Sequence, residues 1–304
     1  MQNTKCLIVT HGFFGDIAFA SSIAKKLKEE NQFDKVDYLI GFPQMQRLLQ
    51  NNPFINDVYV SDFPSAKPVN NSINYSSYDK IIELPELSFI EPPPYEFQKF
   101  AGIKNPSTEY QIYTEPEYDN VAKKLLEKLN SNGKKTLGFL SNWESKSYIF
   151  TEQEYIKGVD VPNLGYGGKH RNINKILTEL SEHFNLIEIG LPPNITQNQS
   201  AILDDSDQKS ILFECSLLKY CDAFIGTEGG MCNLAAGVGT KTIITGDFVH
   251  QLYGWNGVLK KIETPKLGPK YYFQNGNHVT LDPYNTDSDI IRHIIKEMYS
   301  DKNW

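Results

Sequence analysis

Short apolar runs alternate with amphipathic stretches through the first 114 residues. Four of these runs have the length and composition of β-strands: residues 5–10, 36–41, 57–60 and 78–84. Between the first two runs, Ile17, Ala20 and Ala24 keep the spacing of one buried helix face, which predicts a helix over residues 17–30. Strands that alternate with helices in this way predict an α/β fold with a parallel sheet.

The same alternation begins again after residue 114. Residues 115–132 have the pattern of an amphipathic helix with an acidic start, and Gly133 ends it. Four further strands are expected at residues 135–140, 186–190, 222–226 and 241–245, with helices at 172–183, 211–220, 231–238 and 288–299. A length of 304 residues also favours two domains. We therefore predict two Rossmann-like α/β domains, 1–114 and 115–304, with the last helix on either of them.

Glycine-containing turns follow one strand in each half. Gly12, Gly15 and Asp16 come after the first strand, and the sequence TEGG at residues 227–230 follows the strand over 222–226. Ligands of parallel α/β sheets sit outside the carboxyl ends of the strands, where helix N-termini offer free N–H groups to anions. The polar side chains of these turns are Thr227, Glu228 and Asp16, with His11 beside them. The sequence therefore predicts a ligand site at these turns, with Asp16 also placed to cap a helix.

Composition excludes several classes of partner. The net charge of −7 gives no bulk attraction to nucleic acid or anionic membranes. Four cysteines, at positions 6, 215, 221 and 232, form no CxxC pair, which favours reduced, buried thiols in a cytoplasmic protein. Since no segment approaches 18 apolar residues, a soluble protein is expected.

Three segments resemble the heptosyltransferase-like glycosyltransferases, family nine of the sugar transferases. They are residues 12–23 (GFFGDIAFASSI), residues 51–58 (NNPFINDV) and residues 221–240 (CDAFIGTEGGMCNLAAGVGT). The resemblance spans both halves in the order of the family. It implies a GT-B architecture, in which two Rossmann-like domains face a cleft and the C-terminal domain holds a nucleotide-sugar donor. It also implies a soluble enzyme that inverts the anomeric centre, without a metal or other cofactor.

The resemblance assigns roles to particular positions. Asp16 corresponds to the general base that activates the acceptor hydroxyl, with His11, Gly12 and Gly15 around it on the acceptor side. Glu228 and Gly230 correspond to the family's donor-site acid and glycine. Thr227, Gly229 and Met231 complete the donor turn, and the long loop over residues 141–170 supplies Asn142 and Lys169, with Lys146 as the alternative lysine. The family has threonine, proline and histidine where this chain has Gly229, Met231 and Asn233, so ADP-heptose is not predicted as the donor.

The residues leave other functions open. The acceptor favoured by the resemblance is a glycan of the lipopolysaccharide type, but some viral GT-B enzymes modify a nucleic-acid base instead. A nucleotide-sugar epimerase shares the fold and would need a second acid or base at the donor turn. A sugar-binding protein that has lost catalysis is a further alternative, because the departures lie where the sugar would bind.

Overall fold

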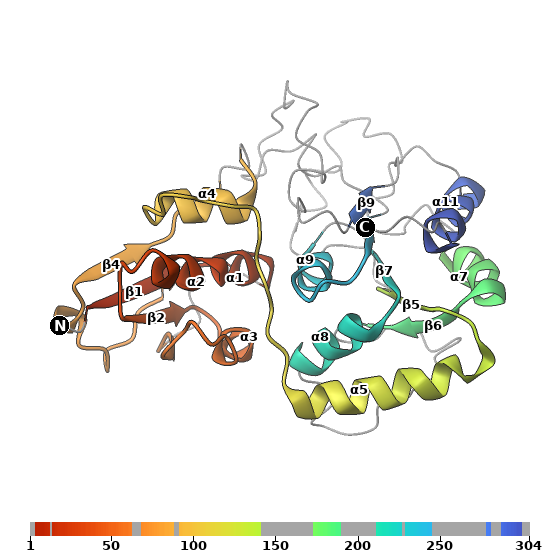
Figure 1. Ribbon diagram of the computed structural model, residues 1–304, viewed down its shortest axis with the longest axis horizontal. Coiled ribbons are helices and arrows are strands. Elements are labelled where there is room, and N and C mark those ends of the chain that lie inside the picture. The colour runs from red at the N-terminus through yellow and green to blue at the C-terminus, as the bar shows by residue number, and fades with distance from the viewer. Residues whose placement is uncertain are drawn as a thin grey trace, which may run out of the picture.

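The computed structural model describes residues 4–12, 14–62, 68–87, 91–140, 173–189, 211–226, 229–244, 278–280 and 287–299. These residues form two parallel sheets, one from each half of the sequence (Figure 1). The predicted α/β fold is therefore confirmed. No helix within the described ranges is both long and apolar enough to cross a membrane.

The first sheet has the strand order β3-β2-β1-β4, and every neighbouring pair is parallel. Its strands are β1 Lys5–Thr10, β2 Lys35–Ile40, β3 Val58–Val60 and β4 Lys80–Glu83. In the central strand β1, Ile8 lies opposite Tyr38 on one side and Ile82 on the other. The chain moves from β1 towards β3 and then returns past β1 to β4, so the direction of winding reverses beside β1.

The reversal determines which connections cover each face of this sheet. Right-handed crossovers put the connections from β1 to β3 on one face and the return to β4 on the other. Accordingly, residues from four helices share a buried cluster with Cys6 and Ile8: α1 Phe14–Ala20, α2 Ser22–Glu29, α3 Gln46–Gln50 and α4 Pro93–Phe100. On the opposite face, Leu7 and Leu39 pack against Ile73 from the β3–β4 connection.

The second sheet has the parallel order β6-β5-β7-β8-β9. Its strands are β5 Thr136–Phe139, β6 Asn185–Glu188, β7 Ala223–Gly226, β8 Thr242–Ile244 and β9 His278–Thr280. One face packs on α7 Ile173–His183 and α11 Asp287–Tyr299, and the other on α8 Ile211–Tyr220 and α9 Gly230–Gly237. The last helix thus packs on α7, beside the second sheet. Because β7 lies on the opposite side of β5 from β6, the winding reverses here too.

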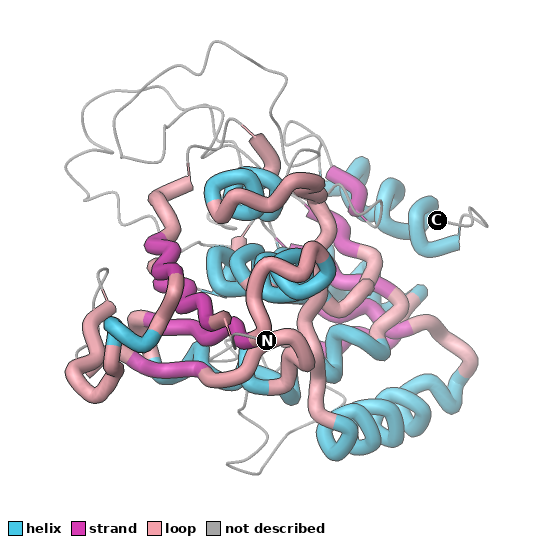
Figure 2. Tube along the Cα trace, turned by 60° about the vertical axis from the view of Figure 1, so that its left-hand side comes forward, coloured by secondary structure: helices cyan, strands magenta, loops and turns pink. Residues whose placement is uncertain are grey.

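The two halves are joined by the segment that leaves α4 and by helix α5 Pro116–Leu129, which packs on α8 (Figures 1 and 2). One buried apolar cluster runs without a break from the helices of the first sheet through Tyr110 and Ile112 to α8 and α9. The two sheets are therefore held by a shared core as well as by the chain that connects them.

One predicted helix needs correction, and one strand was not predicted. The helix expected over 17–30 begins at Phe14 and is divided in two at Ser21. The hydroxyls of Ser21 and Ser22 donate to the carbonyls of Ala18 and Phe19, at 2.6 and 2.7 Å, and such back-bonding bends helices. Because α1 begins at Phe14, Asp16 lies inside the first turn of the helix and not at its cap. Strand β9, within a stretch expected to be loop, was not predicted.

The cysteine prediction is confirmed. All four thiols are buried and unpaired with one another. Burial raises the pKa of the Cys6 thiol to about 12 and raises the pKa of Cys215 and Cys221 further. Thiols that stay protonated in this way are poor nucleophiles and metal ligands, so they contribute packing.

Candidate functional site

Two helices begin at the carboxyl ends of β1 and β7, and their first turns are in contact. Helix α1 follows β1 through residues 11–13, and α9 follows β7 through residues 227–229. Both strands lie where the winding of their sheet reverses, which is the usual location of ligand sites in open α/β sheets. The turn that carries Gly15 and Asp16 and the start of α9 are therefore brought to the same place.

The contact between the two turns depends on glycine. A Cβ atom at Gly15 would lie 2.5 Å from Nδ2 of Asn233 and 3.9 Å from the Cα of Gly230. A Cβ at Gly230 would lie 3.3 Å from the Cβ of Phe14. Larger residues at either position would push the first turns of α1 and α9 apart. Gly15 and Gly230 thus allow the N-termini of α1 and α9 to meet. Each of these helix N-termini adds positive partial charge to the space beside it.

Asp16 lies at this junction with its carboxylate folded back over the turn that precedes α1. A Cβ at Gly12 would be 2.2 Å from Asp16 Oδ2, so a side chain at position 12 would displace the carboxylate. Gly12 also has a φ of +90°, which favours glycine. As an acid in the first turn of a helix, Asp16 stabilises α1. The same position leaves Asp16 half-buried at the carboxyl edge of the sheet.

His11 lies at the same edge but is associated with β4. Its Nε2 is 3.6 Å from Oε1 of Glu83, at the carboxyl end of that strand. Its Nδ1 is buried and has no hydrogen-bond partner within the described ranges. The ring therefore lies at the carboxyl edge beside β4, on the side of β1 away from β2.

On the side of the second sheet, Gly229 precedes α9, and Gly230 and Met231 are the first residues of that helix. The first turn of a helix leaves N–H groups without partners inside the helix, and an anion between the two turns would receive them. Thr227, Glu228, Asn142, Lys146 and Lys169 lie outside the described residues. Within the described residues there is no group of three or more His, Cys, Asp or Glu side chains arranged to hold a metal ion.

Asn233 and Tyr110 are the residues that the predicted site did not include. Asn233 is 6% exposed, and its Oδ1 has no hydrogen-bond partner in the described part of the chain. The Tyr110 hydroxyl donates to the backbone carbonyl of Asn233 at 2.8 Å, while its ring meets Phe19 of α1 edge-on at 5.2 Å. Tyr110 therefore touches both helices of the junction. The apolar alternation of Tyr110 and Ile112 was the available signal, and it indicates an extended segment buried on one side.

The Gly15–Asn233 contact makes a prediction about stability. We expect Gly15→Ala to destabilise the protein by about 1–3 kcal/mol, because the new methyl group overlaps Nδ2 of Asn233. In an Asn233→Ser background the overlap is gone, and the same change should be neutral or stabilising, since alanine is favoured over glycine in helices by about 1 kcal/mol. Urea unfolding of the four proteins measures the coupling. Equal destabilisation in both backgrounds would contradict the contact.

No protein-family model matches the sequence, and no curated protein sequence does. Among solved structures, heptosyltransferase II of E. coli, described as an ADP-heptose lps enzyme, has a TM-score of 0.61 at 11% identity, covering 97% of this chain and 98% of its own. A family 9 glycosyl transferase from Veillonella parvula has a TM-score of 0.60 at 10% identity, covering 98% and 92%.

A third similar structure is the dodecameric, iron-containing heptosyltransferase TibC of E. coli in complex with ADP-D-beta-D-heptose. Its TM-score is 0.53 at 9% identity, and the match covers 98% of this chain and 76% of that one. At these identities the likeness concerns the fold. It confirms the two-sheet GT-B architecture that the sequence resemblance implied.

Proposed function

We propose that the protein is an inverting, metal-independent glycosyltransferase that moves a sugar from a nucleotide-sugar donor to an acceptor hydroxyl. The observation that carries the proposal is the contact between the Gly15–Asp16 turn and the start of α9. It sets the turn that carries the Asp16 carboxylate against the first turn of α9, at the junction of the two parallel sheets. Solved glycosyltransferases with the same fold support a glycosyl transfer reaction.

In the proposed mechanism the acceptor binds on the side of the first sheet. Asp16 takes the proton of its hydroxyl as the oxygen attacks the anomeric carbon, and the bond from that carbon to the diphosphate breaks in the same displacement. The charge released on the diphosphate is stabilised by N–H groups at Gly229–Met231 and by Lys169. Glu228 is proposed to accept hydrogen bonds from sugar or ribose hydroxyls. These fixed hydrogen-bond donors would stabilise the charge on the diphosphate, as a metal ion does in metal-dependent enzymes.

A glycan of the lipopolysaccharide type remains the favoured acceptor. The net charge of −7 disfavours a nucleic-acid acceptor. An epimerase would need a second acid or base on the donor side besides Glu228, and the first turn of α9 carries no acidic residue. A protein that only binds sugars would retain donor binding and lack turnover, so the assay below separates it from an enzyme.

The donor is identified by a panel of ADP-, UDP-, GDP- and CMP-sugars in a thermal-unfolding assay. A ligand that binds the native state raises the unfolding temperature, and we expect one nucleotide class to do so clearly. The shift should shrink in Glu228→Ala, because a hydrogen-bond acceptor for the donor is removed. Release of the nucleotide with inversion at the sugar, only in the presence of an acceptor, would establish transfer. Isomerised free sugar without an acceptor, or binding without any turnover, would contradict the proposal.

A further inference from the structure

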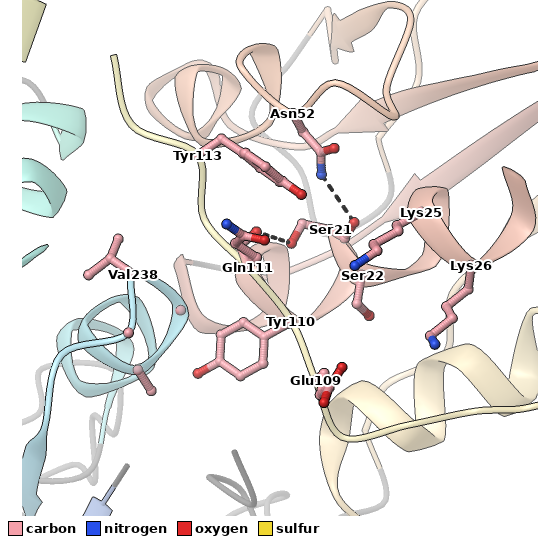
Figure 3. A pocket seen from close by; sticks show the side chains of 13 residues that line it. Ser21, Ser22, Lys25, Lys26, Asn52, Glu109, Tyr110, Gln111, Tyr113 and Val238 are labelled. Carbon is pink, nitrogen blue, oxygen red and sulfur yellow. Dashed lines mark hydrogen bonds between the residues drawn. The ribbon is translucent and has the colours of Figure 1, made fainter. Parts of the chain in front are cut away.

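A pocket of about 340 Å³ lies between the two halves, away from the candidate site (Figure 3). Its walls come from the start of α2, from Asn52, from the crossing segment 109–113 and from residues 236–239 at the end of α9. The candidate site is at the N-terminal ends of α1 and α9, whereas this pocket is at their C-terminal ends. Helices of this length separate the two by about 10 Å.

One wall of the pocket carries positive charge with little compensation. Lys25 and Lys26 both line it, and both approach the same carboxylate, Glu29, at 3.8 and 3.6 Å. Neither ammonium group donates a hydrogen bond to another described residue within normal distance, although each has three N–H donors. In Figure 3 the Lys25 ammonium points towards Ser21 and Gln111. The wall can therefore donate to an anion.

The remaining walls offer groups that suit hydroxyls. The Ser21 hydroxyl donates to the Ala18 carbonyl, which leaves its oxygen able to accept, while the Ser22 oxygen already accepts from Nε2 of Gln98 at 2.9 Å. Tyr113 directs its hydroxyl into the pocket (Figure 3), and Glu109 supplies a carboxylate. The end of α9 adds the negative partial charge of a helix C-terminus. An anionic group would thus be favoured at the lysines and disfavoured at the α9 end, where hydroxyl groups fit.

We propose that this pocket binds a small organic anion with neighbouring hydroxyl groups, the chemistry shared by sugar phosphates and hydroxy acids. The anionic group lies at Lys25 and Lys26, and the hydroxyls face Glu109, Tyr113 and the end of α9. Since the walls belong to both halves and to the segment between them, the bound ligand links the two sheets. The volume of the pocket is at the lower end of the range for small-molecule sites. The inference does not depend on glycosyl transfer.

Calorimetric titration of the full chain tests the proposal with glycerol 3-phosphate and glycerate, and with glycerol and inorganic phosphate as partial ligands. We expect one or both of the organic anions to bind more tightly than either partial ligand. Lys25→Ala/Lys26→Ala should raise the Kd by about tenfold or more, because charge-assisted hydrogen bonds are lost. Lys123→Ala/Lys124→Ala is the matched control, an adjacent exposed pair on α5 outside the pocket, and should leave the Kd unchanged.

A second variant tests the proposal independently, in case the double lysine variant does not fold. Gln111 lines the pocket and is exposed, so Gln111→Trp should fold and fill the space without changing the charge; it should also abolish binding. Three outcomes would overturn the proposal: no binding of either organic anion at millimolar concentration, equal loss in the α5 control, or displacement of the anion by the nucleotide that binds at the start of α9. The last would move the anion to the candidate site, and failure of the transferase assay alone would leave the pocket unaffected.

Discussion

Asp16→Asn is expected to lower kcat by about 10²–10⁴-fold, the range typical of a lost general base. Asparagine keeps the size and a hydrogen-bond acceptor of the aspartate but cannot take a proton from the acceptor hydroxyl. The replacement also fits the space that Gly12 leaves for the carboxylate. Donor binding should be retained, because the diphosphate is proposed to bind at the start of α9. Steady-state kinetics together with nucleotide titration measure the two quantities separately.

The control for this variant is a second aspartate at the opposite edge of a sheet. Asp222 precedes β7 at its amino end and accepts a hydrogen bond from the Thr136 N–H at 2.7 Å. Asp222→Asn makes the same chemical change and retains an acceptor, so kcat should stay near its original value. Near-normal turnover in Asp16→Asn would remove Asp16 from the proposed mechanism. Loss of nucleotide binding in that variant would assign the residue to the donor site or to folding instead.

The strands and most helices were predictable because their patterns are local. Eight runs of apolar residues became strands within a residue or two of the expected bounds, since each is bounded by glycine, proline or charge. The break at Ser21 was hidden, because the apolar spacing continues through it while the serine hydroxyls bind the preceding turn. Strand β9 has three residues, His278–Thr280, and its pairing with β8 defines it. Of these residues only Val279 is apolar, so no apolar run marks the strand.

The candidate site, like the fold, could be predicted from the sequence only where its pattern is local. Glycine turns after β1 and β7 could be placed at the carboxyl ends of parallel strands without knowing the packing between the halves. The role of Gly15 and Asn233 depends on how α1 and α9 approach one another, and no local pattern contains that distance. The fold of Asp16 over Gly12 is likewise a matter of side-chain conformation. Sequence therefore predicted which turns lie at the carboxyl ends of β1 and β7, and tertiary packing determined which of their residues touch.

Tyr110 is the second position at which a large effect is expected. Its ring is 8% exposed, meets Phe19 of α1 and lies beside Gly237 of α9, where a Cβ would be 3.0 Å from Cε2 of the tyrosine. The Ile112 N–H, two residues further along the chain, donates to the Gly237 carbonyl at 2.9 Å. Together with the bond from the Tyr110 hydroxyl, two hydrogen bonds therefore hold this segment on α9. Burial raises the pKa of Tyr110, which keeps its hydroxyl a donor. A tyrosine in this position holds the first sheet against the second.

We expect Tyr110→Ala to lower the free energy of unfolding by about 3–5 kcal/mol, the cost of deleting a large buried ring together with the cavity it leaves. Tyr110→Phe removes only the hydrogen bond to Asn233 and should cost about 1 kcal/mol. Tyr299→Ala removes a ring of the same size that is 51% exposed, and should cost far less than Tyr110→Ala. Urea denaturation followed by circular dichroism compares the three. Because Tyr110 bridges α1 and α9, Tyr110→Ala should also weaken donor binding at the start of α9, which neither of the other variants should do. Equal stability of Tyr110→Ala and Tyr299→Ala would show that the junction of the two sheets does not depend on this side chain.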